Sequence, residues 1–143
     1  MIKVLICCGG GFSSSYMVKR VQNDIIAKGY QEKLMVEYSP FDMSYQVKDN
    51  FDAVMCCPHV ALQLEAYVNH YGKNVPYYVF PNKMYGRMYV EDIYQDALDI
   101  VDGFQKTQMN PFHFPGESNY MTSQRIHSYR HHFPDYKVED LEV

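Results

Sequence analysis

The chain has 143 residues, 47% of them hydrophobic, which suits one globular domain whose core needs no crosslink. It carries 13 Lys and Arg against 17 Asp and Glu, and this formal net charge of −4 argues against a general nucleic-acid binder with a basic face. No apolar run approaches the roughly 20 residues of a membrane span, and the N-terminus is too short and too strand-like for a signal peptide. We therefore expect a cytoplasmic protein, in which cysteines are more often catalytic, metal-binding or inert than disulfide-bonded.

Hydrophobic patterning at the start of the chain predicts a strand, a helix and a second strand. The continuous apolar run over residues 2–7 is typical of a buried strand, and residues 13–28 repeat apolar side chains at helical spacing. A second strand is predicted over residues 34–38 and is broken by Pro40. The polar stretch over residues 44–50 favours a short helix.

The same alternation continues through the middle of the chain. In order, the pattern predicts a strand over residues 51–56, a helix from Pro58 to about Gly72, a strand over 75–80, a loop over 81–87 and an amphipathic helix over 90–104. Strands that alternate with helices imply parallel strands joined by right-handed crossovers. We therefore predict an α/β fold of three layers, α/β/α, around a four-stranded parallel sheet. Ligands of such sheets bind beyond the carboxyl ends of the strands, where Cys7–Cys8, Cys56–Cys57 and Phe80–Pro81 are expected to gather.

The C-terminal segment, residues 105–143, differs in composition from the rest. Aliphatic residues thin out there, while aromatic residues, histidines and prolines recur. Three histidines gather near its end: His127, His131 and His132. We predict a boundary between a domain over residues 1–104 and this segment, which is either an appendage laid on the domain or a mobile tail, with a short helix over about residues 123–129. Its histidines have a metal-binding interpretation, but a solvated surface role is the commoner one.

The junction between the first strand and the first helix carries the clearest chemical signal. Cys8 ends an apolar run and enters a loop rich in glycine and serine. The predicted phosphate-binding loop comprises Gly9, Gly10, Gly11, Phe12, Ser13, Ser14 and Ser15. A helix N-terminus supplies unpaired backbone N–H groups and positive potential, which favour both a bound anion and a thiolate. These residues indicate an anion site around a nucleophile, with a buried structural cysteine as the alternative. Cys7 is expected to face the core, because side chains alternate along a strand.

Three motifs taken in order resemble a known family, the cytoplasmic IIB components of the lactose/cellobiose/chitobiose class of the bacterial phosphoenolpyruvate-dependent sugar phosphotransferase system (PTS). The family opens with a strand, Cys-x-x-Gly-x-Ser-x-Ser and a helix, matched in register by Cys8–Ser15. Cys57-Pro58-His59 stands where the family usually has Gly-Pro-Gln, and Tyr85-Gly86 matches a Tyr-Gly pair after the fourth strand. The aspartate often found shortly before that pair is absent, and Asn82 or a neighbour takes its place. The resemblance covers about residues 1–104.

The resemblance implies both a fold and an activity. The fold would be that of the lactose/cellobiose IIB proteins, similar to the topology of low-molecular-weight tyrosine phosphatases. Cys8 would be the catalytic residue of a protein-phosphocysteine sugar phosphotransferase. It would accept a phosphoryl group from a phosphohistidine on a IIA protein and pass it to a sugar bound by a membrane IIC permease. We expect no cofactor, no metal, no nucleic-acid partner and no direct membrane insertion.

Other chemistries remain as alternatives. The phosphatases just named use Cys-x5-Arg on a similar loop, but here Ser14 stands where the arginine would be, so hydrolysis lacks its main stabilising cation. The residues expected at the edge of the site are Cys57, His59, Tyr85 and Gly86. Cys57 permits a redox bond with Cys8 or, together with His59, a metal site, although this spacing matches no standard zinc motif. A IIB-like regulatory or binding module without transfer activity is a further alternative.

Overall fold

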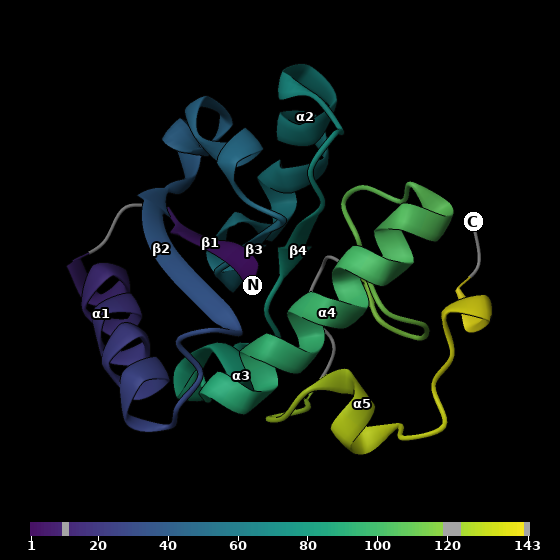
Figure 1. The fold of residues 1–143 in the computed structure, drawn as a ribbon. Coiled ribbons are helices and arrows are strands. Elements are labelled where there is room, and N and C mark those ends of the chain that lie inside the picture. The colour runs from purple at the N-terminus through teal and green to yellow at the C-terminus, as the bar shows by residue number, and fades with distance from the viewer. Residues whose placement is uncertain (10–11, 119–123, 142–143) are drawn as a thin grey trace.

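The chain forms a parallel sheet with helices on both faces (Figure 1). The computed structural model describes residues 1–9, 12–118 and 124–141, without the side chains of residues 12–14. The strands are β1 (Ile2–Cys8), β2 (Leu34–Pro40), β3 (Ala53–Cys56) and β4 (Tyr77–Val79). The α-helices are α1 (Phe12–Ala27), α2 (Ala61–Tyr71), α3 (Asn82–Arg87), α4 (Val90–Thr107) and α5 (Tyr129–His132). Short 3-10 helices are η1 (Phe41–Gln46), η2 (Lys48–Asn50), η3 (Pro58–Val60) and η4 (Val138–Asp140).

The strand order decides where a ligand can bind. Within the described ranges the four strands are parallel and follow the order β2-β1-β3-β4, which confirms the predicted sheet. The chain winds from β1 to β2 on one side and then returns to β3 on the other. A reversal of this kind opens a crevice at the carboxyl ends of β1 and β3. Cys8 ends β1 and Cys57 directly follows β3, so both cysteines lie at that crevice.

Both faces of the sheet are buried, as the continuous apolar strands require. Along β1, Val4 and Ile6 pack into a core with α1 and α4, whereas Leu5 and Cys7 pack into a second core with α2. Figure 1 shows α1 and α4 on one side of the sheet and α2 on the other. The three predicted layers are therefore present. In the part of the chain that the structure describes, no helix is long and apolar enough to cross a membrane.

Two predictions about local structure were wrong. Residues 81–87 were expected to form a loop, but residues 82–87 form α3, a helix too short to show a hydrophobic period, and fully buried Met84 anchors it to the core. A short helix was expected over about residues 123–129. Residue 123 lies outside the described residues, residues 124–128 are not helical, and α5 begins at Tyr129, after Ser128. The Ser128 hydroxyl accepts a hydrogen bond from the His131 backbone N–H (3.2 Å), which is an N-cap.

Aromatic side chains of the C-terminal segment complete the core on the α4 side. Phe112 and Phe114 are fully buried, and Phe112 extends the edge of the sheet because its N–H donates to the Tyr77 carbonyl (2.8 Å). A Cβ placed on Gly103 of α4 would lie 2.6 Å from Cε2 of Phe112 and 2.7 Å from Cδ1 of Leu141. At Gly103 the C-terminal segment therefore packs so close to α4 that a larger residue would not fit without displacing its neighbours. The predicted domain boundary at residue 104 stays a prediction.

Ion pairs join the same segment to α4. Asp92, Asp96 and Asp99 share one face of α4, and each bonds to the segment. Buried Arg125 pairs with Asp96 (3.1 Å) and Glu117 (2.6 Å) and donates to the hydroxyl of Tyr78 on β4. Burial raises the pKa of the Asp96 carboxyl to about 7, although Arg125 acts to lower it. We call this set of ion pairs, which also includes Arg130 with Asp99, the Arg125 seam.

Candidate functional site

The site begins at Cys8, which β1 carries to the edge of the sheet. The Cys8 side chain is 8% exposed, and Gly9 beside it is exposed. Helix α1 starts at Phe12, and its first turn holds no acidic residue to offset the positive end of the helix dipole. Gly10 and Gly11 of the predicted phosphate-binding loop lie outside the described residues, as do the side chains of residues 12–14. The role of that loop, including half-buried Ser15, therefore stays a prediction.

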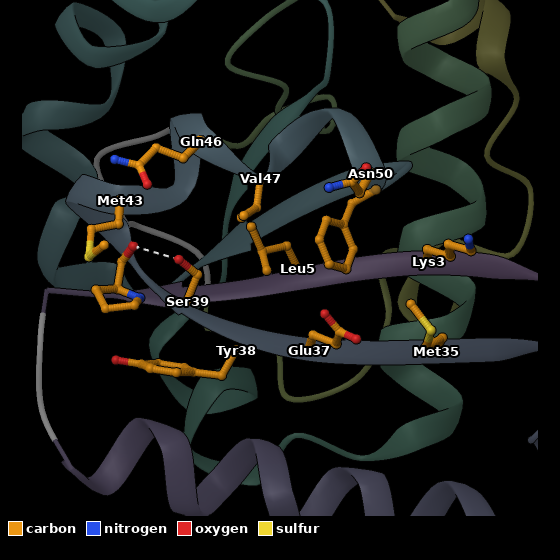
Figure 2. Close-up of a pocket in the computed structure, with 12 residues that line it drawn as sticks. Lys3, Leu5, Met35, Glu37, Tyr38, Ser39, Met43, Gln46, Val47 and Asn50 are labelled. Carbon is orange, nitrogen blue, oxygen red and sulfur yellow. Dashed lines mark hydrogen bonds between the residues drawn. The ribbon is translucent and has the colours of Figure 1, made fainter.

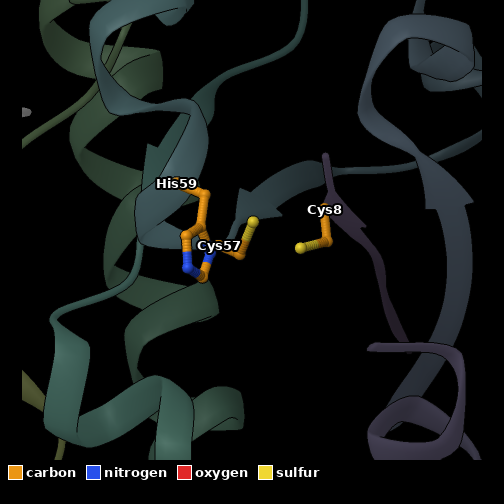
Figure 3. A group of neighbouring side chains, drawn as sticks. All are labelled: Cys8, Cys57 and His59. Atoms are coloured by element: carbon orange, nitrogen blue, oxygen red, sulfur yellow. The ribbon is translucent and has the colours of Figure 1, made fainter. Parts of the chain in front are cut away.

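The neighbouring strand places a second thiol beside the first. Cys7 of β1 and Cys56 of β3 are partners in the register, and the Cys57 backbone N–H continues the ladder by donating to the Cys7 carbonyl (2.8 Å). Pro58 then starts η3, which carries the exposed side chain of His59. The two sulfur atoms and a ring nitrogen of His59 all lie within 4.8 Å of one another (Figure 3). We call Cys8, Cys57 and His59 the thiol cluster.

Hydrogen bonds link the two sulfur atoms of this cluster to each other and to the backbone. The Cys57 and Cys8 side chains are hydrogen-bonded, and the Cys57 sulfur accepts from the backbone N–H groups of Gly9 and His59. Burial first, and then the hydrogen bond to Cys8, raise the pKa of the Cys57 thiol to about 11. Cys57 therefore keeps its proton at neutral pH. A protonated thiol is a poor nucleophile, so Cys8, which precedes the loop that leads into α1, is the better candidate of the two.

Tyr85 and Gly86, also predicted at the site edge, lie on α3 rather than on a loop. Tyr85 is half-buried and packs against Phe80 (ring centroids 5.9 Å apart) and against the core that contains Cys8 and Cys57. Gly86 is exposed on the same helix. The structure thus joins three of the predicted site residues in the thiol cluster and holds Tyr85 against the surrounding core.

Tyr38 is a neighbour of the cluster that the sequence patterns did not single out. It belongs to β2, pairs in register with Ile6 of β1, and is half-buried. Burial, followed by the proximity of Cys8, raises the pKa of the Tyr38 hydroxyl. The sequence could have indicated Tyr38 as a site residue, because it lies near the carboxyl end of a predicted strand, at the edge of the sheet where ligands bind.

A cavity of about 340 Å³ lies beside the site but does not include it (Figure 2). It opens between β2 and the residues of η1 and η2. Its lining residues are Lys3, Leu5, Met35, Glu37, Tyr38, Ser39, Pro40, Met43, Gln46, Val47, Asn50 and Phe51. None of the thiol cluster lines it, so the reactive groups lie at the sheet edge, outside this cavity.

Comparisons with known proteins agree with this geometry. The family model of the PTS lactose/cellobiose-specific IIB subunit matches residues 3–96. Among solved structures, the chain is similar to the lactose-specific IIB component domain of the PTS from Streptococcus pneumoniae, with a TM-score of 0.51 and 12% identity. The match covers 69% of this chain and 96% of that one, and at this identity it shows the fold alone. No curated protein matches significantly.

Proposed function

The chain belongs to the lactose/cellobiose-specific IIB family of the sugar phosphotransferase system, and we propose that Cys8 is the residue that carries the phosphoryl group. Membership of the family makes the chain a phosphotransfer component of sugar transport. The observation that supports Cys8 is its place in the fold. Cys8 ends β1 at the β1–β3 crevice, four residues before α1 begins, and its side chain is hydrogen-bonded to that of Cys57.

The proposed reaction has two in-line transfers. The Cys8 thiolate attacks the phosphorus of a phosphohistidine on a IIA protein, so that an S–P bond forms, the P–N bond breaks and the imidazole keeps the electron pair. A hydroxyl of the sugar held by a IIC permease then attacks the same phosphorus. Its oxygen forms the new O–P bond and loses its proton, while the S–P bond breaks and restores the thiolate. The relay would operate in the cytoplasm, between these two partners.

Side chains around Cys8 have proposed roles in holding the phosphoryl group. Backbone N–H groups of the loop from Gly9 onward and at the start of α1 are the donors for its equatorial oxygens. The exposed imidazole of His59 can reach the same oxygens from η3. The chain offers no arginine at the position that phosphatases use, so the thiophosphate ester persists until the next partner arrives.

Reconstitution of the relay tests the assignment. The full chain is incubated with phosphoenolpyruvate, Mg²⁺, the general transfer proteins and a cognate IIA protein, in the presence of a chelator selective for zinc. We expect one phosphoryl group per chain, mapped to Cys8 by peptide mass analysis, and none on Cys8→Ser. The matched control is His70→Gln, an exposed change at the far end of α2 that leaves transfer intact. A Cys8→Ser protein that still accepts the group overturns the proposal.

A thiol-redox role is the second candidate, because the Cys8 and Cys57 sulfur atoms are neighbours. Peroxide would remove two electrons from the pair, with both protons passing to the reduced peroxide as water, and leave one S–S bond. Mild peroxide treatment followed by peptide mapping tests this role. A Cys8–Cys57 crosslink would support it, and two thiols that remain open to alkylation would exclude it.

A further inference from the structure

The thiol cluster has the donor set of a metal site, and we propose that Cys8, Cys57 and His59 bind one zinc ion. Two thiolates and one imidazole are the ligands that zinc prefers. In the ranges 1–9, 12–118 and 124–141, this is the one group of three or more His, Cys, Asp or Glu side chains whose ligand atoms come this close. His127, His131 and His132 of the C-terminal segment lie close together, with the ring centroids of His127 and His131 4.5 Å apart, but they form no such group there.

The distances between the three ligand atoms are at most slightly longer than those in a zinc site, so a small movement would bring the atoms into place. With Zn–S near 2.3 Å and Zn–N near 2.0 Å, tetrahedral geometry separates neighbouring ligand atoms by about 3.5–3.8 Å. The three ligand atoms of the thiol cluster already lie within 4.8 Å of one another. Figure 3 shows the two sulfur atoms pointing toward the same space, with the imidazole of His59 beside Cys57. The ligand atoms therefore need to approach one another by at most about 1 Å to reach this geometry.

The backbone around the cluster is suited to hold a charged ion. Cys57 is fixed by the bond from its N–H to the Cys7 carbonyl (2.8 Å), whereas His59 is exposed and its ring can turn. The N–H groups of Gly9 and His59 already donate to the Cys57 sulfur. Hydrogen bonds of this kind orient a zinc-bound ligand and tune its charge. Both thiols release their protons to solvent as zinc binds. The two thiolates then neutralise the ion, so the complex places no net charge at this mostly buried edge.

Three protein donors leave a fourth position for water or a small ligand. The Cys8 sulfur would then share its lone pair with zinc and be unable to attack phosphorus. Zinc and the phosphoryl group therefore exclude each other at Cys8. This competition rests on the proposed function, whereas zinc binding itself does not.

Metal binding by the reduced full-length chain tests the site directly. Zn²⁺ is titrated against a colorimetric chelator under a non-thiol reductant, and Co²⁺ is used as a spectroscopic probe. We expect one ion per chain, with thiolate-to-cobalt charge-transfer absorption and tetrahedral d–d bands. His59→Gln and Cys57→Ser should each weaken Zn²⁺ affinity by more than about 100-fold, because loss of a supporting hydrogen bond alone costs roughly 10–100-fold. The control, His70→Gln, should bind as the wild type does.

The outcomes separate this inference from the proposed function. Equal Zn²⁺ affinity in wild type, His59→Gln and Cys57→Ser overturns the site, as does the absence of charge-transfer absorption in the wild-type Co²⁺ protein. The cobalt spectrum needs no variant, so it remains decisive even if a cysteine change impairs folding. Transfer to Cys8 measured with chelator tests the relay alone. If both properties are present, added Zn²⁺ should block phosphorylation, and chelator should restore it.

Discussion

The thiol cluster and the Arg125 seam lie at different parts of the same sheet and are built in opposite ways. The thiol cluster is positioned by backbone bonds between neighbouring strands, and the side chains that make it up are themselves the reactive groups. The Arg125 seam is positioned by side chains, through ion pairs that join α4 to a segment distant in the sequence. Reactivity and stability are therefore separable in this chain. Substitutions should affect one property while sparing the other.

Loss of Arg125 is the strongest way to break the seam. Arg125→Met leaves the Asp96 carboxylate buried without its cation, and breaking such a pair costs about 3–5 kcal/mol. Without Arg125 the folded-state pKa of Asp96 rises further above its usual value of 3.8, so the folded protein binds this proton more tightly than the unfolded chain does. Stability then falls as pH rises, and the loss should be larger at about pH 8 than at about pH 5.

Urea denaturation at the two pH values measures this effect. The Arg130→Gln variant is the control, because the Arg130 side chain is 36% exposed and its partner Asp99 also accepts a hydrogen bond from Gln95 (3.1 Å), so this change should cost less than loss of Arg125. Phosphorylation of the folded fraction should be unaffected in both variants. Equal losses for Arg125→Met and Arg130→Gln would contradict the central place given to Arg125.

Substitution by alanine should have opposite effects on stability at Gly103 and at Gly86. Gly103→Ala forces a Cβ to within 2.6 Å of Phe112 and should destabilise the protein by about 1–2 kcal/mol, because overpacking exceeds the gain in helix propensity. Gly86→Ala on α3 meets no described atom within 4 Å and should stabilise by about 0.5–1 kcal/mol. Thermal unfolding compares the two. A stabilised Gly103→Ala protein would show that the side chains of the C-terminal segment can move away from α4 at little cost in free energy.

Cys57 of the thiol cluster and its neighbour Cys56, which lies outside the cluster, offer a finer comparison of stability. Cys57→Ser should change stability by less than about 1 kcal/mol, because a serine oxygen can accept the same two backbone N–H groups. Cys56→Ser buries a hydroxyl in the core and should cost about 1–3 kcal/mol. Urea midpoints of the two variants test this. A larger loss for Cys57→Ser would mean that the cluster supports the fold as well as the chemistry.

The smallest change in stability is expected for substitution of Tyr136. Its buried hydroxyl has no hydrogen-bond partner among the described residues, so Tyr136→Phe should leave stability unchanged or raise it by up to about 1 kcal/mol. Burial raises the pKa of Tyr136 to about 12, so the wild type loses stability from this group as pH rises from 10 to about 12. The advantage of the phenylalanine should grow over that interval. A destabilised variant would reveal a partner for the hydroxyl.

The alternation of strands and helices, and the end of β1 at a cysteine, could be predicted from the amino-acid sequence. These features are local: the apolar runs of β1 and the helical period of α1 and α4 are set by residues a few positions apart. The family could likewise be identified from the motif around Cys8 and the pair Tyr85-Gly86, because the order and spacing of these motifs can be seen directly in the amino-acid sequence. Short α3 escaped prediction because six residues are too few to display a helical period.

Which distant residues meet depends on the tertiary structure. The sequence predicts that Cys8 and Cys57 lie at the ends of strands, at the same edge of the sheet. Strand order makes β1 and β3 neighbours and brings Tyr38 of β2 nearby, and this order depends on long-range pairing that no local pattern encodes. Likewise, the charges of Asp96 and Arg125 are visible in the sequence, but their meeting requires α4 and the C-terminal segment to pack on one face of the sheet. Burial is what turns these ordinary residues into a strong ion pair and a hydrogen-bonded thiol pair, and burial is a property of the whole fold.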